Sequence, residues 1–414
     1  MEQEIIVGLD IGTTKVCAVV ASVSVGGKFN VLGVGRSLSD GLTRGVVTNI
    51  DKTVRSIQSA VAEAESRSGI KIQSVIVGIA GDHIQSFQSR GVIAISGAEN
   101  EITQADVHRL IEDTKRVALP SDRRIIHVIP QEFIIDGQDG VVDPVGMAGV
   151  RLEANVHIIT GLVTAAQNIY KCVERAGLHI RDMVLEPLAS SYAVLEEEEK
   201  EVGIALLDIG GGTTDLAVFE DRTIRHTAVI PVAGNQVTSD IRRGLGVLNE
   251  QAEKLKCLHG FAYVPSVVDD EPIAIPGIGG RPPLEIDKRL LAQIIQPRIE
   301  EIFEIAALEI KRSGYSRHLS AGVVLTGGGA LIKGCAELAR DVLGMPVKIG
   351  IPSGFNAGLV REIENPIYST CVGLVLHGLR NKETTPLHLG NGNGKGNGSV
   401  KKIFTKMKSW FDEL

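Results

Sequence analysis

Two short segments of the sequence place an aspartate before a turn of glycine and threonine residues. The first reads "LDIGTTK" and contains Asp10, and the second reads "LLDIGGGTTD" and contains Asp208. Each aspartate follows an apolar run typical of a buried strand, and the turn after it offers backbone N–H groups and hydroxyls to a phosphate. Asp10 and Asp208 together suit a hydrated Mg²⁺, which usually takes only one or two carboxylates. The pair predicts a site for a triphosphate and its magnesium ion.

One such segment alone is more often just a turn, so the prediction depends on the pair and on a third segment, "LTGGGA". There a strand, a glycine turn and a helix start suit a nucleoside at the carboxyl edge of a sheet. The sequence has no G-x-x-x-x-G-K-[ST] pattern, which excludes a P-loop site. The residues expected to bind the nucleotide are Asp10, Gly12, Thr13, Thr14, Lys15, Asp208, Gly210, Gly211, Gly212, Thr213, Thr214, Gly327, Gly328, Gly329 and Ala330.

These segments belong to an internal repeat that organises the chain into two related halves. A second pair of segments also matches, "SVIVGIAGD" and "GVVLTGGGA". Amphipathic patterns at residues 52–69, 164–178 and 333–344 predict helices between the strands. Alternating strands and helices predict an α/β fold with mixed sheets. The acidic run "LEEEEKE" at the junction of the halves is expected to be a solvated loop.

Each half contains an insertion. Residues 82–160 have their own capping box, in which Thr103 precedes Asp106 by three positions, then a helix and two strands. They predict a small α+β subdomain. Residues 231–296 read as helical and then as Pro/Gly-rich.

Composition narrows the classes of function. The chain has 414 residues, of which 43% are apolar and 22% charged, and its net charge of −7 argues against general nucleic-acid binding. Five scattered cysteines predict neither a disulfide framework nor a zinc site, and they favour a reducing cytosol. The acidic start leads directly into a strand, so we expect no signal peptide, and no apolar run approaches 18 residues.

The last residues differ from the rest. From residue 395 onward there are five lysines and two acids, a net charge of +3, which leaves −10 for the remainder. Residues 381–398 read as a flexible Gly/Asn linker, and residues 399–414 as a helix with its apolar side chains within an arc of about 120°. Such a helix is too short to span a bilayer and suits a membrane interface, although docking on the body or on a partner is the alternative. The residues expected to meet the membrane are Val400, Lys401, Lys402, Ile403, Phe404, Met407, Trp410, Phe411 and Leu414.

With these motifs the chain resembles the actin/Hsp70/sugar-kinase superfamily. "LDIGTTK" and "LLDIGGGTTD" match the two phosphate loops, "LTGGGA" the adenosine loop, and "LEPLASSYAVL" and "NPIYSTCVGLVLHGL" the two helices that connect the halves. The resemblance implies ATP with Mg²⁺ in a cleft between two RNase H-like halves. It places Glu253 and Lys256 where the superfamily contacts ribose and base, the alternative being a solvated helix face.

Hydrolysis of ATP requires a residue that orients the attacking water. By resemblance this is Glu186 in the first connecting helix, and Asp215 lies where relatives place a polar residue near the γ-phosphate. A structural role in hydrogen bonding between the halves is the alternative for both. We expect slow ATP turnover at most.

The insertion at residues 82–160 and the tethered tail further resemble the FtsA family of bacterial cell-division proteins. The resemblance implies an actin-like fold whose first half comprises residues 1–81, 161–200 and 365–380. It assigns residues 201–230 and 297–364 to the second half, and residues 231–296 to its inserted subdomain.

For function, the family implies filaments on the inner face of the cytoplasmic membrane at the midcell division site. These filaments would bind the tail peptide of the tubulin-like GTPase FtsZ and recruit later divisome proteins. The docking site is implied to lie at the second insertion, and the candidates for meeting an acidic peptide are Arg281, Lys288, Arg289 and the adjoining Arg298, with an ordinary solvated face as the alternative.

Four other functions are the alternatives. The bacterial actin of cell shape is usually shorter and has a different insertion. A pilus-assembly ATPase-like scaffold shares the predicted body but fits the tail less well. A metabolite kinase would need a carboxylate base facing a substrate pocket, and an Hsp70-type chaperone would need a peptide-binding domain after the ATPase body.

Overall fold

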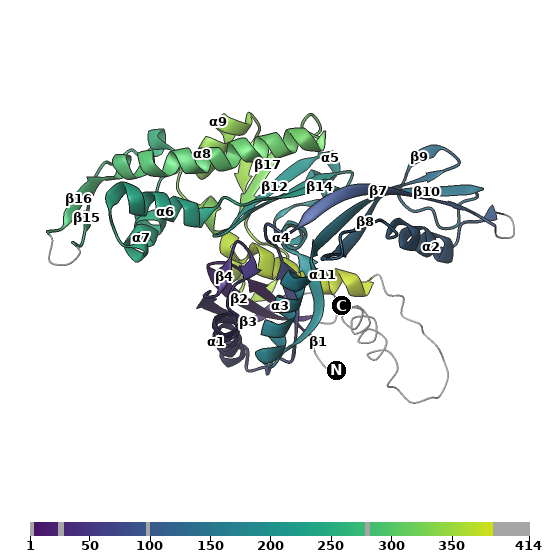
Figure 1. The fold of residues 1–414 in the computed structure, drawn as a ribbon, viewed down its shortest axis with the longest axis horizontal. Coiled ribbons are helices and arrows are strands. Elements are labelled where there is room, and N and C mark those ends of the chain that lie inside the picture. Colours follow the sequence, from purple (N-terminus) through teal and green to yellow (C-terminus); the bar gives the residue numbers. More distant parts are fainter. Residues whose placement is uncertain (1–3, 24–28, 97–99, 278–281, 384–414) are drawn as a thin grey trace. The chain divides into compact units, whose positions relative to one another are not determined.

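The computed structural model describes residues 4–23, 29–96, 100–277 and 282–383. The chain divides into two units, Met1–Gly378 and Leu379–Leu414, and the following paragraphs concern the first (Figure 1). The predicted membrane helix at residues 399–414 lies outside the described residues, together with all of the side chains expected to meet the membrane.

The first half is built on a six-stranded mixed sheet of order β11-β6-β1-β2-β3-β19. β1 pairs with β2 antiparallel and with β6 parallel. Helix α1 (Ile50–Ser68) packs against β3 and α3 (Val163–Arg175) packs against α1, as predicted from their amphipathic patterns. The strands are β1 (Glu4–Ile11), β2 (Lys15–Val23), β3 (Phe29–Leu38), β6 (Ser74–Ile79), β11 (His179–Leu185) and β19 (Ala357–Gly358), with a small hairpin of β4 (Leu42–Thr43) and β5 (Val46–Val47).

The second half repeats this arrangement in a five-stranded sheet of order β14-β13-β12-β17-β18. The β12–β13 hairpin corresponds to β1–β2, and β17 lies parallel to β12 as β6 does to β1, so the internal repeat is confirmed. Helices α8 (Lys288–Ser313) and α9 (Cys335–Leu343) complete its core around Phe303. The strands are β12 (Ile204–Ile209), β13 (Thr214–Glu220), β14 (Thr223–Ile230), β17 (Val323–Thr326) and β18 (Val347–Ile349), and η3 (Gly328–Leu331) follows β17.

The first insertion folds as a four-stranded antiparallel sheet of order β7-β10-β8-β9, with α2 on one face. The predicted capping box is present, because Thr103 and Asp106 bond each other's backbone N–H groups. Ser86 on β7 and His157 on β10 both hydrogen-bond Thr227 of β14, so this subdomain also touches the second half. Its elements are β7 (Gln85–Ala94), α2 (Gln104–Thr114), β8 (Arg123–Ile135), β9 (Gln138–Val141) and β10 (Arg151–Leu162).

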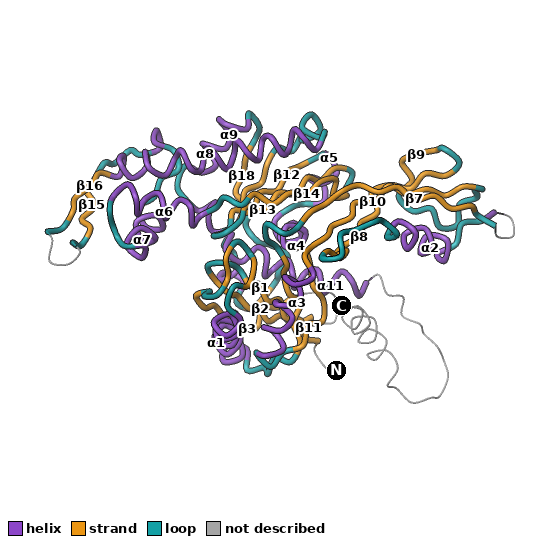
Figure 2. Tube along the Cα trace, viewed as in Figure 1, coloured by secondary structure: helices purple, strands orange, loops and turns teal. Residues whose placement is uncertain are grey.

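The second insertion contains two helices and a small hairpin that leads directly into α8 (Figure 2). Because α8 continues through Pro297, the predicted boundary between residues 296 and 297 falls inside a helix. The elements are α6 (Gly234–Leu245), α7 (Asn249–His259), η2 (Val264–Ser266), β15 (Pro272–Ile275) and β16 (Leu284–Asp287).

The halves are joined by α4 (Glu186–Val194), followed by α5 (Glu197–Val202), and by α11 (Ser369–Glu383), preceded by α10 (Val360–Ile363) and η4 (Pro366–Tyr368). The prediction of a loop at "LEEEEKE" is wrong, because residues 197–202 form the helix α5. Acidic side chains favour the N-terminal turn of a helix. Lys200 is buried and lies over the rings of Tyr192 and Phe219, which anchors the helix.

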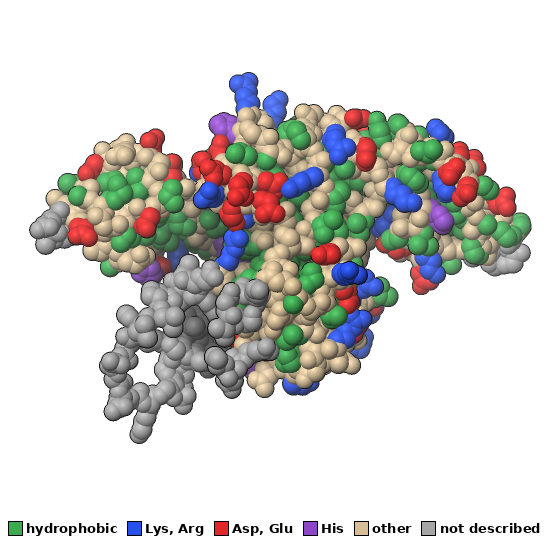
Figure 3. Space-filling view, turned by 180° about the vertical axis from the view of Figure 1, so that it is seen from behind, with side chains coloured by type: hydrophobic (Ala, Val, Ile, Leu, Met, Phe, Trp, Pro, Cys, Tyr) green, Lys and Arg blue, Asp and Glu red, His purple; other side chains and the backbone are tan. Residues whose placement is uncertain are grey.

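The charged side chains of the surface are mixed in sign. Figure 3 shows basic side chains scattered among acidic ones on one face of the molecule. Within the described residues no helix is both long enough and apolar enough to cross a bilayer.

Candidate functional site

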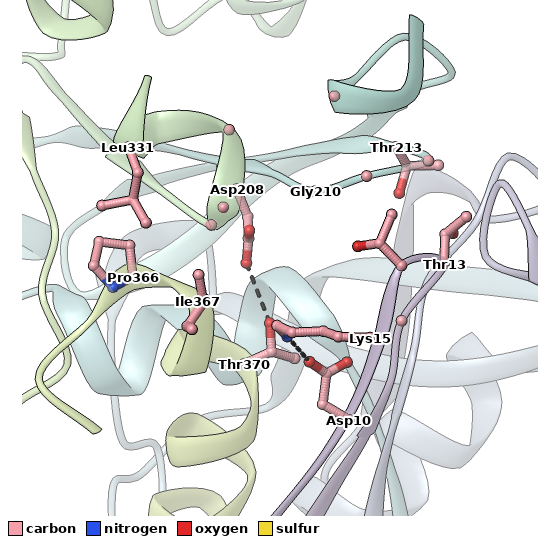
Figure 4. A pocket seen from close by; sticks show the side chains of 18 of the residues that line it. Asp10, Thr13, Lys15, Asp208, Gly210, Thr213, Leu331, Pro366, Ile367 and Thr370 are labelled. Atoms are coloured by element: carbon pink, nitrogen blue, oxygen red, sulfur yellow. Dashed lines mark hydrogen bonds and ion pairs between the residues drawn. The ribbon is translucent and has the colours of Figure 1, made fainter. Parts of the chain in front are cut away.

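A pocket of about 330 Å³ opens where the loops after β1, β12 and β17 converge from the two halves. In Figure 4, Leu331, Pro366 and Ile367 lie on one side and Thr13 and Thr213 on the other. The predicted site residues that line it are Asp10, Gly12, Thr13, Thr14, Lys15, Glu186, Asp208, Gly210, Gly211, Gly212, Thr213, Asp215, Glu253, Lys256, Gly327, Gly328 and Gly329.

Two predicted residues lie beside the pocket rather than on its wall. The hydroxyl of Thr214 donates to the backbone oxygen of Val232 at 2.8 Å, so it serves the local turn. Ala330 is 4% exposed and belongs to the core of the second half.

The two predicted phosphate loops have the same turn and touch each other. Gly12 N donates to Lys15 O, and Gly210 N donates to Thr213 O, each at 3.0 Å. A Cβ atom on Gly211 would lie 2.2 Å from Thr14 Cγ2, so only glycine allows this approach. The loops are therefore placed to hold a phosphate chain between them.

Two of the lining glycines that were not predicted from the sequence, Gly45 and Gly234, contact the phosphate loops. Gly45, in the turn between β4 and β5, donates its N–H to Thr13 Oγ1 at 3.1 Å and so orients that hydroxyl. Gly234 begins α6, and its N–H donates to Gly210 O at 3.1 Å. Each glycine lies at a turn between two elements, but nothing local links that turn to a phosphate loop far away in the sequence.

Acidic groups dominate the centre of the pocket. Lys15 Nζ lies 2.7 Å from Asp10 Oδ2 (Figure 4). Burial disfavours the lysine charge, but Asp10 outweighs it, and the pKa of Lys15 is raised. Burial, with a contribution from Asp10, raises the pKa of Asp208 against the hydrogen bonds from Ser190 and Thr370.

The pKa values of two further carboxylates in the pocket, Asp215 and Glu186, are also raised. Burial and then the neighbouring Asp208 raise the pKa of Asp215 to about 8. Asp215 Oδ1 is buried and has no hydrogen-bond partner among the described residues. Burial, followed by Asp10, Asp215 and Asp208, raises the pKa of Glu186 well above its ordinary value. These buried carboxylates repel one another, and a bound divalent cation would relieve that repulsion.

This set of carboxylates fits a hydrated magnesium ion. In the part of the chain that the structure describes, no three His, Cys, Asp or Glu side chains are placed to ligate one metal ion directly. The predicted arrangement needs no such triad, because Mg²⁺ commonly keeps several waters and uses one or two carboxylates. Asp10 and Asp208, one from each half, remain the predicted pair.

The other end of the pocket is formed by α7 and apolar side chains. Lys256 is buried, and its ammonium donates to Gly234 O (3.1 Å), Thr238 Oγ1 (2.9 Å) and Glu253 Oε2 (2.8 Å). The alternative that Lys256 lies on a solvated helix face is therefore wrong. The lining residues that the sequence did not reveal here are Cys257, Leu258, Gly260, Leu331, Ile332, Lys333, Pro366 and Ile367. Such residues carry no motif, and the fold alone assembles them.

Three of the four predicted partner-binding cations form ion pairs with nearby carboxylates. Lys288 pairs with Glu271 at 3.1 Å, and Arg289 lies 3.7 Å from Asp270. Arg298 bonds Asp240 at 2.6 Å and also Glu301, and these contacts raise its pKa. Arg281 lies outside the described residues.

Comparison with known proteins gives consistent matches. The family model described as "Cell division protein FtsA" matches residues 205–373, and that described as "SHS2 domain inserted in FTSA" matches residues 81–160. The chain is 48% identical to the cell division protein FtsA of Pseudomonas aeruginosa over 377 residues, which cover 91% of this chain and 90% of that one. It is 42% identical to the Neisseria meningitidis protein of the same name, over 99% of both chains.

Solved structures confirm the actin-like fold. The PilM-PilN type IV pilus biogenesis complex gives a TM-score of 0.67 at 17% identity, covering 90% of this chain and 98% of that one. MreB5 of Spiroplasma citri bound to ADP gives 0.55 at 16% identity, covering 92% and 99%. The MamK double helical filament gives 0.51 at 14% identity, covering 92% and 99%.

Proposed function

Because this chain belongs to the FtsA family of cell division proteins, we propose that it is an ATP-binding, actin-like scaffold of the division site. In this proposal it polymerises on the inner face of the cytoplasmic membrane, tethers the FtsZ ring through its C-terminal helix and helps recruit later divisome proteins. The observation that carries the proposal is the identity of 42% over 99% of both chains, which includes the tail region.

The pocket supports the nucleotide part of the proposal. The contacting loops around Thr14 and Gly211 would hold the phosphates, and Asp10 and Asp208 the hydrated Mg²⁺. Glu253 and Lys256 would contact the ribose and base. Bound Mg-ATP supplies a phosphoanhydride bond, and Glu186, on the pocket wall, would orient the water for slow hydrolysis. The likeness to an MreB bound to ADP agrees with this role.

The amphipathic sequence pattern of residues 399–414 supports the proposed attachment to the membrane. An amphipathic helix with lysines on its polar face holds a membrane weakly, each lysine adding about 1 kcal/mol near anionic lipid. Stable attachment would therefore require several tails at once, which a filament supplies by raising their effective concentration. The fold neighbour described as a double helical filament is consistent with self-association.

The second insertion is the proposed docking site for the FtsZ tail peptide. Val268 is 94% exposed and Leu284 41% exposed, so apolar side chains lie open here beside Lys288 and Arg289. An acidic peptide with apolar residues would match both features. Arg298 is less available, since its guanidinium already bonds Asp240 and Glu301.

Fluorescence imaging of dividing cells tests the proposal. We expect a midcell band for the tagged full chain and a weaker or absent band for a copy ending at Gly398. Trp410→Glu, on the predicted apolar face, should act like the truncation, whereas Ser409→Ala, on the predicted polar face, should keep the band. Diffuse signal from the full chain would reject the proposed function and favour a metabolite kinase.

A further inference from the structure

The carboxylate of Asp208 accepts hydroxyl hydrogen bonds from two side chains on one oxygen. Ser190 Oγ donates to Asp208 Oδ2 at 2.7 Å, and Thr370 Oγ1 lies 3.3 Å from the same atom. The two hydroxyl oxygens are 3.1 Å apart, so the three groups form a closed triangle. Figure 4 shows the contact between Asp208 and Thr370 on the pocket wall. Ser190 is wholly buried.

The hydroxyls come from the two helices that join the halves. Ser190 lies on α4, and Thr370 lies in the first turn of α11. Helix α11 is held to the first half, because Cys371 Sγ donates to the backbone oxygen of Gly8 in β1 at 3.2 Å. Asp208 belongs to β12 of the second half. The hydrogen bond from Thr370 therefore links the first half to a carboxylate of the second.

The two helices are in direct backbone contact at this place. A Cβ atom on Gly373 would lie 1.8 Å from the backbone oxygen of Ala189, so no other residue fits without moving a helix. Ser190 follows Ala189, and Thr370 lies three residues before Gly373 on the same side of α11. The two hydroxyls are thus next to the point where the helices touch.

The direction of the Ser190 hydroxyl is not the usual one for a serine in a helix. Its neighbour Ser191 is equally buried, and Ser191 Oγ donates to Leu188 O of the same helix at 2.7 Å. Such local bonds to a backbone carbonyl are the common choice for helical serines. Ser190 instead donates to a carboxylate of another element, while the second oxygen of Asp208 lies beside Gly327 on the pocket wall.

We propose that Ser190 and Thr370 are positioning residues that hold Asp208 for the divalent cation and couple the cation's affinity to the angle between the halves. The inference rests on the proposed function, namely that this pocket binds Mg-ATP. Hydroxyl donors fixed on Oδ2 orient the carboxylate and leave its other oxygen for a metal-bound water. Partners of this kind typically change metal affinity by about 10- to 100-fold when they are removed.

The coupling follows from the location of the hydroxyls. A rotation of the halves that moved α4 or α11 relative to β12 would break the triangle and release Asp208. By linkage, a cation that favours the held carboxylate also favours the arrangement of the halves in which the triangle is closed. The two connecting helices thus contact the proposed metal ligand Asp208 through the side chains of Ser190 and Thr370.

Nucleotide binding to the full chain, measured with and without Mg²⁺, tests the inference. The variants are Ser190→Ala and Thr370→Val, with Thr370→Ser as the conservative change and Ser191→Ala as the matched control. We expect Ser190→Ala and Thr370→Val each to weaken ATP binding about 10-fold or more in Mg²⁺. In EDTA their affinities should equal that of the wild type within about 2-fold. Thr370→Ser and Ser191→Ala should behave like the wild type in both conditions.

Equal losses in Mg²⁺ and in EDTA, or no loss in either, would overturn the positioning role. If Thr370→Val fails to fold, Ser190→Ala decides alone, because it removes one oxygen from a serine that no solvent reaches. If the wild type binds no ATP in either condition, the proposed function itself fails. The two failures are therefore distinguishable within one set of titrations.

Discussion

Asp208 and Asp215 are direct partners across the β12–β13 hairpin, and both are buried. Like charges directly opposite each other destabilise a sheet. We predict that Asp215→Asn raises the melting temperature of the nucleotide-free protein in EDTA at pH 8. A gain of about 1–2 kcal/mol corresponds to a few degrees. Asp139→Asn, an exposed aspartate on β9, should change nothing. A lower melting temperature for Asp215→Asn would contradict the repulsion.

Cys257 is the exposed cysteine and lines the pocket, whereas the other four cysteines are buried. We predict that one thiol per chain reacts with iodoacetamide at pH 8.5 and that Mg-ATP slows this reaction at least about 5-fold. The alkaline pH is needed because burial and the nearby Glu253 raise the pKa of this thiol. Cys257→Ser should abolish the reaction. Equal rates with and without Mg-ATP would argue that the nucleotide binds elsewhere.

His157 joins the first insertion to β14, and its ring accepts or donates a 3.0 Å bond to the hydroxyl of Thr227. Burial, and then the neighbouring His226, lower the pKa of His157 to about 4. The unfolded chain, with an ordinary histidine pKa of about 6.5, therefore binds the proton first as the pH falls. The free energy of unfolding should decrease as the pH falls from 6.5 to 4, with a slope that reaches at most about 1.4 kcal/mol per pH unit for this histidine midway between the two pKa values.

Urea unfolding of His157→Gln at pH 6.5 and pH 5 checks this. The variant should lose about 2 kcal/mol less than the wild type over that interval. His108→Gln, an exposed histidine on α2, should keep the wild-type slope. The same pH slope in His157→Gln and in the wild type would rule out a neutral buried His157.

The three paired cations Lys288, Arg289 and Arg298 should have two different roles. Lys288→Glu with Arg289→Glu is predicted to weaken binding of the FtsZ tail peptide about 10-fold and to change the melting temperature less than Arg298→Ala does, because the carboxylate partners Glu271 and Asp270 are exposed to solvent and such pairs contribute little to stability. Arg298→Ala should instead lower the melting temperature, since Asp240 and Glu301 both lose their partner. Peptide titration and thermal unfolding measure the two effects. Loss of peptide binding with Arg298→Ala alone would assign docking to Arg298.

The repeat made most of the fold predictable. Asp10 and Asp208 mark equivalent hairpins, and their matched neighbours β6 and β17 lie where the repeat predicts. The phosphate loops carry strong local motifs because a backbone turn around phosphate demands glycine at fixed positions. Local structure can therefore be predicted from the sequence wherever the backbone geometry restricts the residue type.

Features that depend on tertiary contacts could not be predicted from the sequence. The acidic run before Lys200 looked solvated, yet a buried cation over two rings fixes it as a helix. Ser190 and Thr370 bear no motif, and their shared contact with Asp208 exists only because two helices meet there. The apolar wall with Ile367 likewise draws on residues far apart in the chain.

We propose that this protein links FtsZ to the membrane through its tail, and vesicle co-sedimentation measures that link. Anionic vesicles are mixed with Mg-ATP, FtsZ and either the full chain or a chain ending at Gly398. We predict that FtsZ sediments with the vesicles only when the full chain is present, and not when FtsZ lacks its C-terminal peptide. If FtsZ sediments equally with the truncated chain, or stays in solution while the full chain binds the vesicles, the tail does not link FtsZ to the membrane.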